Sequence, residues 1–301
     1  MSNNKLDQKA FLIDSTGFVL KYWFSMPVIK TKEHESISAF LGFCNFVIKF
    51  LKTYKPLYLS FAFDESLGTC FRNKIYPDYK RSREKAPKEL KIQFKLCREF
   101  LNLLGISNIA SKEYEADDIL YTLSKNNREK KLNNIIITND KDLYQIVHEG
   151  DLWWDFAEKK YTKKDLVEKL GFLPQKLPDY FGLMGDAVDG IPGAPGIGNK
   201  TASALMIKYK NLDNILMSVD TIPLKLGDRY KRFIKIIEDN KKIIYLSKKL
   251  ATLEYIDSLN KNISSLNRKE VDFTKLDNFL SQTGMKEGQK YSWIRNIKES
   301  I

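Results

Sequence analysis

The chain has 301 residues, 43% hydrophobic and 29% charged, which is the balance of a folded protein and excludes a disordered one. The formal net charge of +12 favours a polyanionic partner, nucleic acid before an acidic membrane surface. Three cysteines without a CxxC pair exclude a disulfide scaffold and a zinc ribbon, and they predict a reducing compartment. No apolar run reaches membrane-spanning length and the N-terminus lacks the order of a signal peptide, so we expect a cytoplasmic protein.

Four short apolar runs in the first half have the length and composition of strands. They are residues 10–14, 57–64, 135–140 and 151–156. Apolar residues at helical spacing separate them, over 37–51, over 90–104 and from Glu115 onward. This alternation predicts an α/β fold whose mostly parallel central sheet is flanked by helices.

The pattern changes near residue 171. Strand-like runs stop, glycine and proline crowd residues 185–198, and a helix is predicted over 199–210. The remainder is lysine-rich and has a helical pattern. We therefore expect an α/β core over 1–172 and a helical region over 173–301.

Three of the four predicted strands end in an aspartate, namely Asp14, Asp64 and Asp140. Ligands of open α/β sheets bind beyond the carboxyl ends of the strands, so these acids are expected to meet at one edge. Asp142 follows Asp140 at the spacing of residues that share a strand face.

Five further acids cluster in sequence. In a helix that begins near Glu115, Asp118 shares a face with that residue and Asp117 lies to one side. Asp186 and Asp189 have the same spacing of three residues. Taken singly, each of the nine acids is more simply read as a helix cap or a turn residue.

Nine acids brought together in a basic chain would require cations to offset their repulsion. Oxygen ligands select Mg²⁺ or Mn²⁺, and with two histidines and no cysteine cluster a zinc site is disfavoured. Two such ions, about 4 Å apart, can activate a water and stabilise the leaving oxygen of a phosphodiester. These features together predict a metal-dependent nuclease.

A basic stretch follows the strand that ends at Asp64. It contains Arg72, Lys74, Tyr76, Tyr79, Lys80, Arg81 and Arg83. Interleaved cations and aromatics suit contacts to phosphates and stacking on unpaired bases, although a solvated charged loop is an equal alternative. The place of this stretch, just beyond a carboxylate-bearing strand end, favours the functional interpretation.

The stretch GIPGAPGIGNKTA begins at Gly190. Gly193, Gly196 and Gly198 would let the backbone pass close to a phosphate, and the helix that follows would present N–H groups, with Lys200 and Thr201 in its first turn. It is neither a P-loop nor a dinucleotide fingerprint. The alternatives are an ordinary helical hairpin and, as the sharper hypothesis, binding of duplex DNA through its phosphates.

The series FLID, FAFD, EYEADD, TNDKDLYQ and GLMGDAVDGIPGAPGIGNKTA resembles the 5′-nuclease family over about residues 10–253. That family includes the 5′–3′ exonuclease domain of bacterial DNA polymerase I and phage flap endonucleases. The resemblance implies a PIN-like nuclease core and a helix-three-turn-helix that grips duplex DNA, often with K⁺ bound by backbone carbonyls.

The resemblance also implies roles for individual residues. Two Mg²⁺ ions, replaceable by Mn²⁺, would be held at a first site by Asp14, Asp64, Glu115, Asp117 and Asp118, and at a second by Asp140, Asp142, Asp186 and Asp189. Lys80 and Arg83 match positions on a helical gateway that contact the scissile phosphate. Arg72 matches a nearby basic position. Tyr79 would stack on a base, and Arg81 and the glycine-rich stretch would bind DNA.

Three residues depart from the pattern of the family. Ser15 and Lys21 replace the usual Gly and Arg. Gly190 replaces a frequent Asn, a change that we expect to loosen its turn. None of the three removes a ligand.

The resulting hypothesis is a structure-specific 5′–3′ exonuclease or flap endonuclease. It would cut DNA at a 5′ end, flap or nick, and RNA annealed to DNA, as a monomer in primer removal and repair, functionally linked to DNA polymerase and ligase. No polymerase segment follows, which fits either a stand-alone enzyme or a domain of a longer protein. The alternatives are a catalytically silent protein that binds branched DNA and a small-ribonuclease relative with a similar core.

Overall fold

The computed structural model describes residues 9–30, 36–259 and 263–300. Its centre is a six-stranded sheet with the order β3-β2-β1-β4-β5-β6. The strands are β1 (Lys9–Asp14), β2 (Tyr58–Asp64), β3 (Ser107–Ser111), β4 (Asn133–Ile137), β5 (Leu152–Trp154) and β6 (Lys160–Thr162). All pairings are parallel except that of β5 with β6. The expected α/β fold with a mostly parallel sheet is confirmed.

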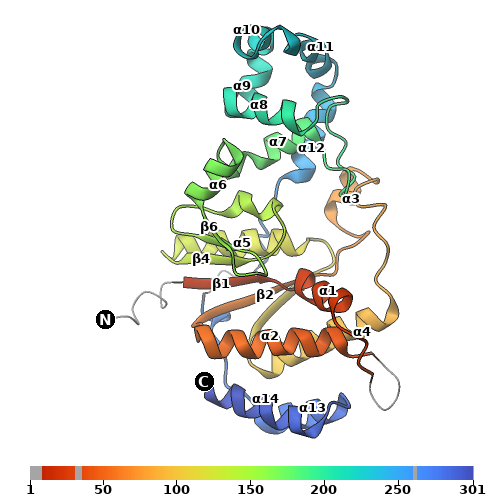
Figure 1. Cartoon of the computed structure of the whole chain (residues 1–301), viewed down its shortest axis with the longest axis vertical. Coiled ribbons are helices and arrows are strands. Elements are labelled where there is room, and N and C mark those ends of the chain that lie inside the picture. Colours follow the sequence, from red (N-terminus) through yellow and green to blue (C-terminus); the bar gives the residue numbers. More distant parts are fainter. Residues whose placement is uncertain (1–8, 31–35, 260–262, 301) are drawn as a thin grey trace.

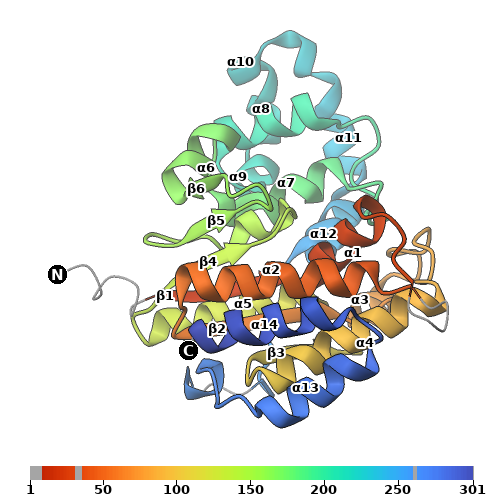
Figure 2. The ribbon, with the colours of Figure 1, turned by 60° about the horizontal axis from the view of Figure 1, so that its bottom comes forward.

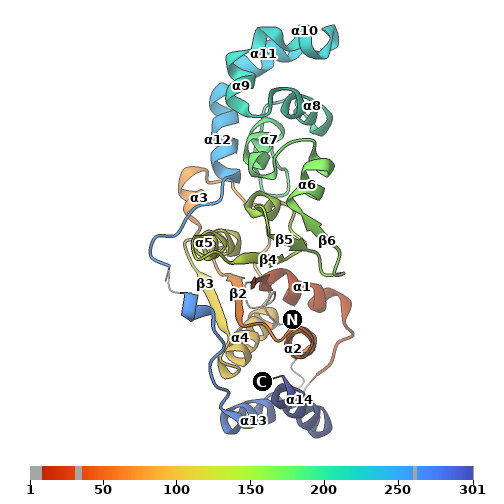
Figure 3. The ribbon, with the colours of Figure 1, turned by 90° about the vertical axis from the view of Figure 1, so that its left-hand side faces the viewer.

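Helices cover both faces of the sheet (Figure 3). α5 (Ala116–Glu129) lies on one face, and α1 (Ser15–Ser25), α2 (Ser38–Tyr54) and α4 (Lys88–Leu103) lie on the other. The central strands β1 and β4 are apolar on both sides, as expected for buried parallel strands. In β1, Leu12 packs into the core beside α5, whereas Phe11 and Ile13 pack into the core beside α2.

Beyond the sheet, the helices from α6 to α12 form a projection towards the top of Figure 1. They are α6 (Lys163–Leu170), α7 (Leu177–Met184), α8 (Asn199–Tyr209), α9 (Leu212–Met217), α10 (Ile222–Leu226), α11 (Arg232–Asp239) and α12 (Lys241–Ala251). α7 packs closely on α12, because Gly182 has no side chain to hold them apart. The buried Asp179 of α7 forms an ion pair with Lys248 of α12, with 2.7 Å between the two charged groups.

The last two helices do not stay with this projection. α13 (Phe273–Gln282) and α14 (Glu287–Glu299) lie against α2 and α4, on the far side of the sheet from the projection (Figure 2). Leu280 of α13 is buried in the core beside α2, and Trp293 of α14 donates to Asn45 of α2 at 2.8 Å. The region expected to be one helical unit over 173–301 thus sends its final helices back to the α/β core. The domain boundary at 172 remains a prediction.

Several local expectations differ from the structure. The sequence analysis does not predict β3, β6 or α1, and it does not predict the 3-10 turn η2 (Asp142–Ile146) that follows β4. Between α3 (Phe71–Ile75) and α4, the chain over 76–87 forms turns rather than the expected helical gateway. Within the described ranges, no helix is long and apolar enough to cross a bilayer.

Candidate active site

The carboxyl ends of β1, β2 and β4 bring three aspartates to one edge of the sheet, because these strands are direct parallel neighbours. Thr138, just after β4, joins two of them: its hydroxyl donates to Asp14 at 3.0 Å and accepts from the N–H of Asp140 at 2.9 Å. Asp64 accepts from the N–H and hydroxyl of Ser66, at 2.9 and 2.8 Å. Thr138 and Ser66 position these aspartates, and the sequence motifs did not predict this role. Each lies only two residues from an aspartate, Thr138 from Asp140 and Ser66 from Asp64.

The other acids approach this edge from three further elements. Glu115 is the N-cap of α5, and Asp117 lies in the first turn of that helix. Asp186 and Asp189 lie in the loop after α7, where the N–H of Ile191 donates to the carbonyl of Asp186 at 2.7 Å. Asp142 begins η2.

Mutual repulsion shows that these acids share one region. Burial raises the pKa of Asp14 to about 6, and the charges of Asp140 and Asp64 add to this rise. Burial likewise raises the pKa of Asp142 to about 8, with Asp140 and Asp189 contributing. The pKa of Asp117 is also raised well above its ordinary value, first by burial and then by Asp140 and Asp14. A bound cation would relieve this repulsion.

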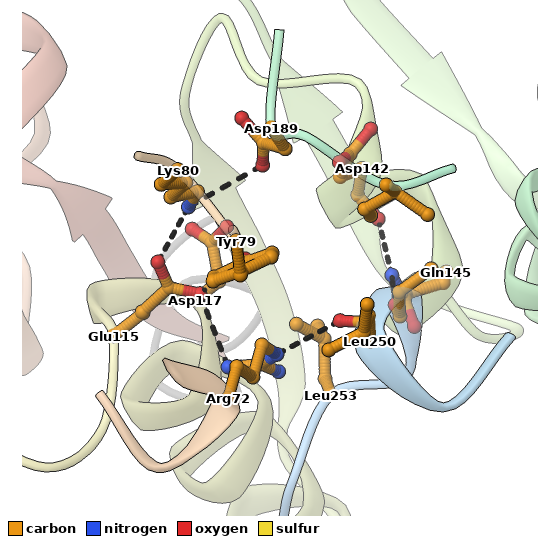
Figure 4. A pocket seen from close by; sticks show the side chains of 12 residues that line it. Arg72, Tyr79, Lys80, Glu115, Asp117, Asp142, Gln145, Asp189, Leu250 and Leu253 are labelled. Atoms are coloured by element: carbon orange, nitrogen blue, oxygen red, sulfur yellow. Dashed lines mark hydrogen bonds and ion pairs between the residues drawn. The ribbon is translucent and has the colours of Figure 1, made fainter. Parts of the chain in front are cut away.

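Two cations of the turn segment, residues 76–87, lie beside the acids. Figure 4 shows one of them, Lys80, between Glu115 and Asp189. The ammonium of Lys80 lies 2.5 Å from Glu115 Oε1 and 3.4 Å from Asp189 Oδ2. The Arg83 guanidinium lies 2.5 Å from Asp189 Oδ1. Burial alone would raise the pKa of Glu115, but Lys80 and Arg72 outweigh it and the pKa is lowered. The structure therefore brings the predicted cations Lys80 and Arg83 to two of the predicted acids, Glu115 and Asp189.

Arg72 is placed differently from the prediction. Its side chain is 1% exposed and bonds to Glu115, to Asp118 and to the carbonyls of Leu250 and Thr252. No N–H remains for a phosphate, so the expected phosphate contact is not supported by its position.

Asp118 is also placed differently. It is 0% exposed and lies in a fork with Arg72 at 2.7 and 2.8 Å. It further accepts from the backbone N–H groups of Glu254 and Glu115, at 2.8 and 3.1 Å. Both oxygens of Asp118 thus have hydrogen-bond partners inside the protein. Asp118 therefore stabilises the start of α5 and does not face the pocket.

Tyr79, expected to stack on a base, is only 4% exposed, and its hydroxyl donates to Glu115 at 2.8 Å. Buried beneath Lys80, the ring cannot reach a base in this conformation. Arg81, in contrast, is exposed and forms an ion pair with Asp78 at 2.8 Å.

The glycine-rich stretch connects α7 to α8 and divides into a buried and an exposed part. Gly193 is buried and its N–H donates to Ser247 of α12 at 2.9 Å, so its role is to pack the loop and not to contact DNA. Gly196, Gly198 and Lys200 are exposed at the N-terminus of α8. The N–H groups of a first helical turn lack intrahelical partners and can bind a phosphate.

The turn of Gly190 is tight rather than loose. Its φ is +68°, and a Cβ there would lie 2.7 Å from the carbonyl oxygen of Asp78. The absence of a side chain allows the loop to dock on the turn segment, where the N–H of Lys80 donates to the carbonyl of Asp189 at 2.8 Å.

A pocket open to solvent lies where these elements meet, with an empty volume of about 280 Å³. It is lined by Arg72, Tyr79, Lys80, Glu115, Asp117, Asp142, Gln145, Asp189, Ile191, Leu250, Ala251 and Leu253. Gln145 donates to the carbonyls of Asp142 and Ala251 and so joins η2 to α12. The sequence analysis did not predict this residue as part of the site.

The donor set fits a hard divalent cation, since every acidic side chain here offers oxygen and burial disfavours its bare charge. Among the described residues, no three His, Cys, Asp or Glu side chains lie close enough together to hold a metal ion. Lys80 and Arg83 instead neutralise Glu115 and Asp189.

Comparison with known proteins agrees with this arrangement. Residues 9–171 match the model of the N-terminal resolvase-like domain of 5′–3′ exonuclease, and residues 172–274 match its C-terminal SAM fold. The chain belongs to the 5′–3′ exonuclease family.

Relatives of similar length include proteins named 5′–3′ exonuclease. That of Aquifex aeolicus is 34% identical over 92% of this chain and 92% of the relative, and that of Buchnera aphidicola is 31% identical over 96% and 94%. DNA polymerase I of Caldicellulosiruptor bescii is 31% identical over 92% of this chain but only 33% of its own length.

Solved structures share the fold of this 5′–3′ exonuclease family member. T5 5′-exonuclease with bound zinc has a TM-score of 0.64 and 17% identity, covering 97% of this chain and 98% of that one. The catalytic core of Rad2 in complex with DNA substrate has a TM-score of 0.65 and 16% identity, covering 97% and 93%.

Proposed function

We propose that this protein hydrolyses phosphodiester bonds of DNA near 5′ ends, at flaps and at nicks, and also of RNA annealed to DNA. The observation that carries the proposal is the convergence of acids beside Lys80 and Arg83, from the ends of parallel strands, the start of α5, η2 and the loop after α7. The names of the family relatives support the 5′–3′ direction of this activity.

The acids would hold two Mg²⁺ ions, with Mn²⁺ as a substitute. The candidate ligands are Asp14, Asp64, Glu115, Asp117, Asp140, Asp142, Asp186 and Asp189, while the buried pair with Arg72 removes Asp118 from this set. Bound ions of this kind supply an activated water and compensate the charge on the leaving oxygen.

Lys80 and Arg83 would bind the scissile phosphate. Both already lie at the acid cluster, and the Arg83 side chain is 40% exposed, so it can exchange Asp189 for a phosphate oxygen. Arg81 would contact the backbone nearby.

The α/β core would carry out the cleavage, and the exposed loop and first turn of α8, over 196–201, would hold the duplex, with K⁺ bound by loop carbonyls. Because all the groups named lie within one chain, a monomer suffices. Trimming a 5′ end leaves a gap or nick, which are substrates for a polymerase and a ligase, and this chemistry supports a role in primer removal and repair.

The test is cleavage of a 5′-flap duplex labelled at its 5′ end, in Mg²⁺ and then in EDTA. We expect Mg²⁺-dependent release of short 5′ products by the wild type. Asp142→Asn should abolish cleavage, because an amide lacks the charge needed to hold a cation, while leaving DNA affinity within about threefold.

Binding without cleavage by the wild type, in either Mg²⁺ or Mn²⁺, would instead favour a catalytically silent protein that recognises branched DNA. Preferential cleavage of single-stranded RNA would favour a ribonuclease. A folded Asp142→Asn variant that loses binding would contradict the metal role of this residue.

A further inference from the structure

Arg72 lies where the helical projection joins the α/β core. On one side, its Nε and Nη2 donate to the carbonyls of Leu250 and Thr252, at 2.8 and 2.9 Å, at the C-terminal end of α12. On the other, its guanidinium forks onto Asp118 and reaches Glu115 Oε2 at 3.0 Å, at the N-terminal end of α5.

The chemistry of this site requires arginine. A guanidinium has N–H donors in a planar fork, which can serve a carboxylate and two carbonyls at once, whereas an ammonium offers a single point charge. A cation also complements the negative end of α12, and the acids complement the positive end of α5. One side chain thus connects the ends of two helices whose residues lie far apart in the sequence.

Arg72 also determines the orientation of Glu115. Glu115 Oε2 is held by Arg72 and by the hydroxyl of Tyr79 at 2.8 Å, so Oε1 is the oxygen that points to Lys80 and the pocket. The residues that hold Oε2 are buried, which leaves the carboxylate one way to face (Figure 4).

We propose that Arg72 is a positioning residue. It orients the carboxylate of Glu115 towards the other acids of the site, and it fixes the end of α12 relative to the start of α5. This inference rests on the proposed function, in which Glu115 contributes to a metal site. Arg72 acts through Glu115 and does not touch the phosphate.

The experiment compares Arg72→Lys with Asp179→Asn in the full chain. Asp179→Asn weakens the ion pair with Lys248 between α7 and α12, and it disturbs the same helix without contacting the acid cluster. For each protein we would measure Mn²⁺ binding without DNA by electron paramagnetic resonance, kcat and KM on a 5′-flap duplex, and the melting temperature.

We expect Arg72→Lys to weaken Mn²⁺ binding and lower kcat by about tenfold, the size of effect usual for groups that orient metal ligands. KM for DNA should change by less than about twofold, because no phosphate contact is lost. Asp179→Asn should lower the melting temperature without changing Mn²⁺ affinity. A raised KM with unchanged Mn²⁺ affinity would overturn the proposal and restore a phosphate contact.

A second variant separates positioning from stability. The pair Arg72→Met and Asp118→Leu replaces a buried ion pair by apolar side chains, a change that proteins often tolerate. Weakened Mn²⁺ binding in this folded variant would support the proposal, and wild-type Mn²⁺ affinity would overturn it. If the wild type itself neither bound Mn²⁺ nor cleaved DNA, the proposed function would fail, whereas normal wild-type behaviour with unaffected variants would remove only the role of Arg72.

Discussion

Gly190 illustrates how one residue fixes the spacing between two functional segments. Its positive φ and the 2.7 Å approach of the Asp78 carbonyl leave no room for a Cβ. We predict that Gly190→Ala lowers the free energy of unfolding by about 2 kcal/mol and lowers kcat, because the loop that carries Asp189 must move away from Lys80. Chemical denaturation and flap cleavage would measure the two effects.

The matched control is Gly68→Ala. Gly68 has a φ of +80° but nothing within 4 Å of a Cβ, so it would bear only the backbone strain. Equal losses of stability in the two variants would show that the contact with Asp78 is unimportant.

At the scale of a secondary-structure element, the N-terminus of α8 presents Gly198 and Lys200 to solvent. We predict that Lys200→Ala weakens duplex binding for all sequences alike and lowers the salt dependence of log K by about one unit, as expected for one lost phosphate contact. Titrations at several salt concentrations would measure this slope. Lys164→Ala, on the exposed face of α6, should leave it unchanged, and the same slope change in both variants would argue against a specific role for α8.

The elements also show what the sequence could and could not predict. β1, β2 and β4 were predictable because each contains a run of apolar residues with an aspartate at its end or within three residues of it. β3 was not, because SNIAS has no apolar run and its place beside β2 includes a polar contact between Ser60 and Ser107. The acids could be found as strand and helix ends, whereas the partners of Arg72, the carbonyls of Leu250 and Thr252, lie 178 and 180 residues away and carry no side-chain signal.

At the scale of the whole molecule, the acid cluster makes stability depend on pH. The pKa of Asp14 rises from 3.8 to about 6 and that of Asp142 to about 8, so the folded protein holds protons that the unfolded chain releases. The stability contributed by this protonation is complete below about pH 4 and is lost as the pH rises towards 8. We predict that the metal-free protein melts at a lower temperature at pH 8.5 than at pH 5.5.

Calorimetry in EDTA would test this, with Asp142→Asn as the control that should reduce the difference. Added Mg²⁺ should raise the melting temperature mainly at pH 8.5, where the acids are ionised. A melting temperature that increases with pH in EDTA would contradict the assignment of these acids to one cluster.

The return of α13 and α14 to the α/β core has a mechanical consequence. The chain leaves the core before α6 and re-enters it after α12, so the projection is joined to the core by two chain segments, and Arg72 links its base to the core. A body joined at two points can turn about the line between them, but its movement in other directions is restrained. In a nuclease of the kind proposed, α8 would therefore stay at a nearly constant distance from the acids. That distance would set how far from the bound duplex the strand is cut.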